Sequence, residues 1–133
     1  MDSRWVDHQQ CYQFYYPISE RNISWIPLEQ RKLLVNFAGN KQAWHNQELY
    51  RERRKVSQIA ERLFRDRFDL YGPGWNRSVT LMQKLGIRKT ESFASYRGYA
   101  ADKLDTLRHY KYALCYENCR GRRGLITEKI FDC

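Results

Sequence analysis

The order of apolar and polar positions predicts a strand, a helix and a second strand between residues 33 and 71. Residues 33–38 form a nearly continuous apolar run closed by Gly39-Asn40, which is typical of a strand buried on both faces. Residues 48–64 then follow a helical period. The apolar residues that we expect on its core face are Leu49, Val56, Ile59, Ala60 and Leu63. Residues 68–71 form a second short strand, so the pattern predicts a βαβ unit in a parallel sheet.

The second half of the chain gives less regular signals. Residues 79–85 are either a short helix or irregular, and residues 95–99 are predicted to be a loop. Asp102 is the expected N-cap of a helix that ends near Tyr110, and residues 112–116 are a third buried strand. A basic glycine-bearing loop follows, with Thr127 as the expected N-cap of a last helix.

The periodic signals begin at Arg31 and define the domain organisation. Residues 1–30 contain Pro17 and Pro27, have no sustained period and are expected to be a linker or arm, with residues 23–28 extended. Residues 31–133 then carry an α/β, doubly wound pattern that is incomplete. We therefore expect the chain to be a fragment of a larger protein and to be inactive alone.

Composition and charge narrow the class of protein. The 133 residues allow one domain at most, 15% of them are aromatic, and no apolar run approaches a membrane span. The formal net charge of +9 is typical of proteins that bind nucleic acid, nucleotide phosphates or anionic lipid. The four cysteines form no CxxC pair and have no zinc spacing, so we expect no structural metal and interpret them as reduced thiols.

The loops that follow the predicted strands are the expected ligand site, because ligands of open parallel sheets bind at the carboxyl ends of the strands. A glycine-bearing loop that enters a helix at Thr127 offers backbone N–H groups and a helix dipole to a diphosphate. Lys129 adds a positive charge, and Glu128 is placed to accept hydrogen bonds from sugar hydroxyls. From spacing alone, however, the favoured alternative is that Glu128 and Lys129 are a solvated pair in the first turn of the helix. The corresponding alternative for Asn118 is that it caps the loop.

Several ordered motifs give the chain a resemblance to a known family. Residues 110–118 read Tyr-Lys-Tyr-Ala-Leu-Cys-Tyr-Glu-Asn, and residues 126–132 read Ile-Thr-Glu-Lys-Ile-Phe-Asp. Upstream, residues 48–53 read Glu-Leu-Tyr-Arg-Glu-Arg, and residues 68–75 read Phe-Asp-Leu-Tyr-Gly-Pro-Gly-Trp. Over roughly residues 17–133 the sequence resembles the α-1,3-fucosyltransferases of glycosyltransferase family 10.

The resemblance implies the N-terminal part of a Rossmann-like donor-binding lobe in a GT-B glycosyltransferase. Such an enzyme transfers L-fucose from GDP-fucose to a glycan acceptor, such as a GlcNAc-type sugar in α-1,3 linkage, with inversion. By resemblance, Lys129 neutralises the diphosphate, Glu128 holds ribose or sugar hydroxyls, and Asn118 lines the nucleotide pocket beside Thr127. Asn40 either approaches the donor or forms the turn after its strand. The resemblance implies no permanently bound cofactor and leaves a divalent metal open.

This chain departs from the family pattern at two places. The family has a Tyr before Ile-Thr-Glu-Lys, where this chain has Leu125. The family also has a phosphate-binding Arg just before the Glu-Leu-Tyr motif, where this chain has Asn46 and Gln47. Arg51 or Arg53 could replace that Arg, but we expect both to be surface charges of the amphipathic helix. No residue of the chain is identified as the catalytic base, which is expected in the acceptor lobe.

Two other functions are open from the sequence. One is a small nucleic-acid-binding module, although the resemblance favours no nucleic acid as partner. Its basic helix face and stacking rings would be Arg51, Arg53, Arg54, Lys55, Arg62, Trp44, Trp75 and Tyr99. The other is a donor-lobe relic with a structural role. The expected location is cytoplasmic with peripheral inner-membrane contact through the basic helix in a bacterium, or Golgi in a eukaryote.

Overall fold

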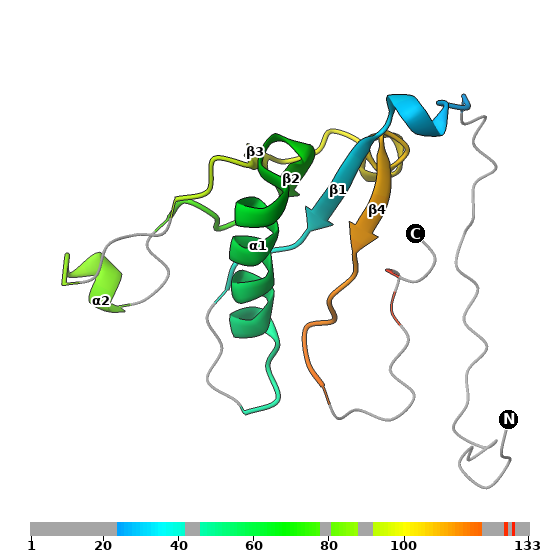
Figure 1. The fold of residues 1–133 in the computed structure, drawn as a ribbon. Helices are drawn as coiled ribbons and strands as arrows, with labels where there is room; N and C mark the ends of the chain where they lie inside the picture. Colours follow the sequence, from blue (N-terminus) through cyan, green and yellow to red (C-terminus); the bar gives the residue numbers. More distant parts are fainter. Residues whose placement is uncertain are drawn as a thin grey trace, which may run out of the picture.

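A parallel sheet forms the centre of the computed structural model, which describes residues 24–41, 46–77, 81–87, 92–120, 127 and 129 (Figure 1). The strand order within this part is β3-β2-β1-β4. Its strands are β1 (Lys32–Phe37), β2 (Phe68–Tyr71), β3 (Tyr96–Gly98) and β4 (Tyr110–Leu114). Its helices are α1 (Tyr50–Phe64), α2 (Leu81–Lys84) and α3 (Lys103–Leu107), with short 3₁₀ turns at Leu28–Gln30 and Arg65–Arg67. The chain therefore has an α/β fold compatible with a Rossmann-like domain.

The predicted βαβ unit is confirmed. β1 pairs in parallel with β2 through Leu34 and Phe68, and α1 connects the two strands. β4 pairs in parallel with the other side of β1, where Leu34 lies opposite Tyr112. From β1 the chain therefore adds β2 and then β3 on one side of β1, and it then adds β4 on the other side of β1. The strand order reverses between β1 and β4, the position at which open α/β sheets bind ligands.

The face of α1 that packs on the sheet differs from the predicted one. The buried residues of α1 are Arg53, Ser57 and Ala60, whereas Ile59 and Leu63 are exposed. Small side chains let the helix approach the sheet closely, and Ser57 Oγ accepts a hydrogen bond of 2.9 Å from the Asn36 amide on β1. The predicted face is therefore confirmed at Ala60 but not at Ile59 and Leu63, because two polar side chains, Arg53 and Ser57, occupy the rest of the buried face.

The prediction of a loop at residues 95–99 is wrong, because β3 lies there. Leu70 N donates to Ser95 O and Gly72 N donates to Gly98 O, each at 2.9 Å. The strand is three residues long and includes Gly98 at φ +82°, so its sequence carries no strand period. Backbone pairing with β2, rather than local propensity, makes this segment extended.

The remaining elements follow the predictions closely. Asp102 caps α3 by accepting hydrogen bonds from Leu104 N and Asp105 N, but α3 ends at Leu107 rather than near Tyr110. β4 lies two residues before the predicted strand, and α2 lies within the ambiguous segment 79–85. Residues 24–27 have no regular structure, and the rest of the predicted arm, residues 1–23, lies outside the described residues. Across the described ranges, every helix is too short or too polar to cross a membrane.

Candidate functional site

The loops after β1 and β2 are joined directly at the carboxyl edge of the sheet. Asn40 N donates to Pro73 O at 2.8 Å, and the Asn40 side-chain amide donates to Gly74 O at 3.1 Å. Trp75 Nε1 donates to Ala38 O at 2.6 Å. Asn40 is buried, and its Oδ1 accepts from Arg54. The structure therefore places Asn40 at the predicted edge but uses its side chain to hold two loops together, which favours the turn-forming alternative.

Gly74 is required for this close approach. It adopts φ +85°, and a Cβ at this position would lie 2.3 Å from Asn40 O. Gly86 also has a positive φ, +73°, but a Cβ there would meet no atom within 4 Å. We expect Gly74→Ala to lower the free energy of unfolding by roughly 2 kcal/mol more than Gly86→Ala, because overpacking adds to the shared backbone strain. Urea unfolding of both variants measures the difference, and equal losses would contradict the contact.

Arg53 connects the loop after β1 to the segment after β4. Its guanidinium donates to Gly39 O at 3.1 Å and to both Tyr116 O and Glu117 O at 3.0 Å. It also donates to Asn118 Oδ1 at 3.2 Å. Arg53 is only 3% exposed, so the prediction that it is a surface charge is wrong. Its spacing of four and seven residues from Ser57 and Ala60, two small side chains, was the available sequence signal.

The charge of Arg53 is held among backbone dipoles. Burial lowers the pKa of its guanidinium, while the nearby Tyr50, Glu117 and Glu48 oppose that shift. Because the group stays protonated far above neutral pH, the two loops meet around a fixed positive charge. With so little of its surface accessible, Arg53 is a positioning residue for this edge.

Asn118 lies where α1 begins. Its carbonyl accepts from Leu49 N at 3.1 Å, and Arg120 N donates to Gln47 O at 2.8 Å. The segment after β4 is thus paired antiparallel with the residues that precede α1. Asn118 itself is exposed, so its side chain is accessible at this edge while its Oδ1 contacts Arg53.

Thr127 and Lys129 converge on Glu117. The Lys129 ammonium lies 3.3 Å from Glu117 Oε2 and 3.3 Å from Thr127 Oγ1. Thr127 donates a short hydrogen bond to the other Glu117 oxygen. Two predicted residues are therefore brought together at the end of β4, with Glu117 as an acceptor that the sequence analysis missed. Glu128 and the rest of the predicted last helix lie outside the described residues.

The N-terminus of α1 is already occupied by a carboxylate. Glu48 Oε2 accepts from Tyr50 N at 2.6 Å and from Arg51 N at 3.2 Å. A side chain that caps the first turn satisfies the N–H groups that would otherwise bind an anion. The two N–H groups that Glu48 binds at the start of α1 are therefore not available to a phosphate.

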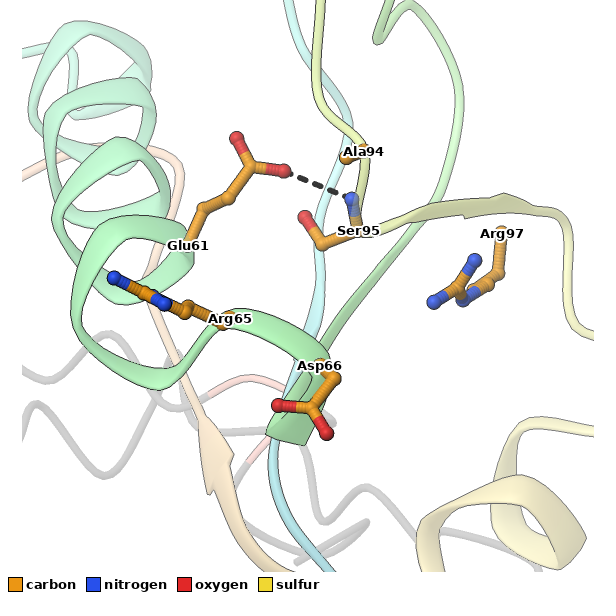
Figure 2. Close-up of a pocket in the computed structure, with 6 residues that line it drawn as sticks. All are labelled: Glu61, Arg65, Asp66, Ala94, Ser95 and Arg97. Carbon is orange, nitrogen blue, oxygen red and sulfur yellow. Dashed lines mark hydrogen bonds between the residues drawn. The ribbon is translucent and has the colours of Figure 1, made fainter.

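A cavity with a volume of about 420 Å³ lies elsewhere in the described part of the chain (Figure 2). Its lining residues flank the amino ends of β2 and β3, and they are Glu61, Arg65, Asp66, Ala94, Ser95 and Arg97. Glu61 accepts from Ser95 N at 2.8 Å across it, whereas Ser95 Oγ is buried without a partner in the described part of the chain. None of the predicted donor-binding residues lines this cavity.

A much smaller cavity, of about 10 Å³, lies at the carboxyl edge beside Lys129. Phe37 and Leu114, at the ends of β1 and β4, form its walls, together with α3 residues Lys103 and Leu107. It has room for about one water molecule. This cavity is too small for a nucleotide.

The residues described here contain no cluster of three or more His, Cys, Asp or Glu side chains that could hold a metal ion.

No family model, curated protein or solved structure matches this chain. The fold class therefore rests on the sheet itself, and the fucosyltransferase resemblance rests on its ordered motifs.

Proposed function

We propose that the chain is the donor-binding part of an inverting GT-B fucosyltransferase that uses GDP-fucose and a glycan acceptor. The observation that carries the proposal is the meeting of Thr127 and Lys129 with Glu117 at the reversal of strand order, beside Asn118. A parallel α/β sheet presents sugar nucleotides at this kind of edge. The ordered motifs around residues 110–118 and 126–132 indicate, by resemblance, the family and its donor GDP-fucose.

The carboxylate at the N-terminus of α1 supports a diphosphate site after β4 instead. Glu48 accepts hydrogen bonds from Tyr50 N and Arg51 N, so these two backbone N–H groups are not available to an anion. After β4, a threonine hydroxyl and a lysine ammonium share one carboxylate, Glu117, whose side chain is 32% exposed. A diphosphate carries more charge than this carboxylate, so it can take over the Lys129 contact.

Each predicted residue then has a chemical role in the proposed reaction. The acceptor hydroxyl attacks the anomeric carbon, the bond to the diphosphate oxygen breaks, and GDP leaves with the electron pair. Lys129 stabilises the developing charge on GDP, which is an electrostatic task. Thr127 and Asn118 contact the nucleotide, Glu128 holds its hydroxyls as the resemblance implies, and Asn40 keeps the neighbouring loops in place. The proton of the acceptor goes to a base outside these residues.

Nucleotide-dependent thermal stability tests the proposal. We expect GDP and GDP-fucose to raise the Tm of the 133-residue chain saturably, since a ligand at 100 times its Kd adds about 2.7 kcal/mol. ADP and UDP should have little effect. Lys129→Ala should weaken the GDP effect, whereas Lys55→Ala, at an exposed position of α1, should preserve it.

Three outcomes would contradict the proposal. They are no shift with GDP, equal shifts with all nucleoside diphosphates, and equal loss of the shift in both lysine variants. Random oligonucleotides serve as the competing ligand. If they bind with a steep salt dependence while GDP does not, the chain is a nucleic-acid-binding module instead. Trp75, one of the rings assigned to base stacking in that alternative, is 1% exposed and cannot stack on a base.

A further inference from the structure

Between β2 and β3 the chain leaves the core after Trp75 and returns to it at Phe93, and hydrogen bonds join the two ends of this excursion. The Asn76 amide accepts from Phe93 N at 2.6 Å and donates to Phe93 O at 3.2 Å. The buried rings of Trp75 and Phe93 meet edge to face, with centroids 5.0 Å apart. The two ends of the excursion are therefore part of the core.

Residues 81–87 lie in the middle of this excursion, and we call them the apolar tip. Its four large apolar side chains are each more than half exposed, and they are Leu81, Met82, Leu85 and Ile87. Backbone bonds of 2.9 Å from Leu85 N to Leu81 O and from Ile87 N to Met82 O give the tip a defined shape. Figure 1 shows α2, the first part of the tip, standing away from α1 and the sheet.

Charges around the apolar tip have one sign. Lys84 within the tip and Arg77 before it are both exposed. The sequence contains no Asp or Glu between Gly72 and Thr90, although the whole chain has 15 acidic residues. An exposed apolar cluster whose described neighbours in sequence include Lys84 and Arg77 fits a partner that is apolar and negatively charged.

We propose that the apolar tip inserts into the interface of a membrane that contains anionic lipids. Exposed leucine, methionine and isoleucine side chains enter the boundary between headgroups and acyl chains, while Lys84 and Arg77 contact the anionic headgroups. This assigns membrane contact to the tip rather than to the basic helix α1. α1 contains Glu52 and Glu61 among its cations, so it lacks the uniform charge of the tip.

Sedimentation of the 133-residue chain with vesicles tests this proposal. We expect binding to mixed phosphatidylcholine–phosphatidylglycerol vesicles and much weaker binding to pure phosphatidylcholine. The double variant Leu81→Ser/Leu85→Ser should lower the partition coefficient by about tenfold or more, because two side chains lose apolar burial. Lys84→Glu should also weaken binding.

Matched variants on α1 control for general effects of polarity and charge. Ile59→Ser/Leu63→Ser removes two exposed apolar side chains, and Lys55→Glu reverses one exposed charge. Both should bind vesicles like the wild type. All substituted positions are exposed, and unchanged Tm values would show that each variant folds.

The proposal is overturned if the wild type does not bind, or if it binds neutral and anionic vesicles equally. Equal losses in the tip and α1 variants would also overturn it. A stable dimer that dissociates in Leu81→Ser/Leu85→Ser would assign the tip to a second copy of the chain instead. Light scattering of the same samples detects that outcome.

Discussion

Arg53→Met is expected to lower the free energy of unfolding by about 3–5 kcal/mol, since hydrogen bonds to charged groups contribute roughly 1.5–3 kcal/mol each. The substitution keeps an unbranched side chain but removes every donor to Gly39 O, Tyr116 O and Glu117 O. These carbonyls belong to two segments far apart in sequence, so the substitution removes the side-chain hydrogen bonds that join the loop after β1 to the segment after β4. The Tm should fall by roughly 10–20 °C.

The neighbouring arginine Arg51 provides a matched control. It lies on the same helix but is exposed, so Arg51→Met should change stability by less than about 0.5 kcal/mol. Arg53→Lys keeps the charge but not the planar fork, and it should recover only part of the loss. Urea unfolding followed by circular dichroism gives all three values.

The same variants separate a positioning role from a phosphate-binding role. If Arg53→Met folds and still shows the GDP-dependent rise in Tm, Arg53 holds the loops without contacting the nucleotide. If stability is unchanged in Arg53→Met, the contacts that join the two loops carry no energy and the interpretation of this residue fails.

Local sequence signals were sufficient for β1, α1 and β2. Each has a strong period or a continuous apolar run, and the Gly-Pro-Gly turn at residues 72–74 ends β2 sharply. β3 could not be predicted in the same way, because three residues with a glycine acquire strand structure only by pairing with β2. The apolar period also did not predict which face of α1 packs on the sheet, since a buried arginine, Arg53, lies on that face.

The candidate site was likewise predictable from the sequence only in part. The convergence of Thr127 and Lys129 at the end of β4 follows from a rule about parallel sheets, so it could be expected before any contact was known. Their common acceptor Glu117 could not, because it depends on how the segment after β4 folds back. Asn40 lies at the expected edge, but the hydrogen bond to Gly74 O is a contact across 34 residues that no local pattern predicts.

A buried aspartate on β2 should produce the second large effect. Asp69 is 4% exposed and accepts hydrogen bonds from Lys32 at 2.6 Å, Arg97 at 2.7 Å and Tyr110 at 2.7 Å. These donors come from the other three strands of the described sheet, so one carboxylate joins all four. Asp69→Asn removes the charge that two cations share. We expect a loss of about 2–4 kcal/mol, below the full cost of a broken buried pair because Lys32 and Arg97 are partly exposed.

The pH dependence of stability distinguishes this carboxylate from a surface one. Burial alone would raise the pKa of Asp69, but the hydrogen bonds from Lys32, Tyr110 and Arg97 outweigh it and hold the pKa below its ordinary value. A carboxyl group with a lowered pKa in the folded state stabilises the protein above its unfolded pKa of about 3.9. That stabilisation is lost as the pH falls through the lower, folded value.

Urea unfolding between neutral pH and strong acid should therefore show a stability decrease below about pH 4 that is smaller in Asp69→Asn than in the wild type. Asp105→Asn is the matched control, because Asp105 pairs with Arg108 on the surface of α3 with 58% of its side chain exposed. That variant should lose at most about 1 kcal/mol and keep the acid dependence of the wild type. If Asp69→Asn and Asp105→Asn had the same acid profile, the four strands would not depend on one shared negative charge, and Lys32, Arg97 and Tyr110 would be neighbours of Asp69 rather than its stabilising partners.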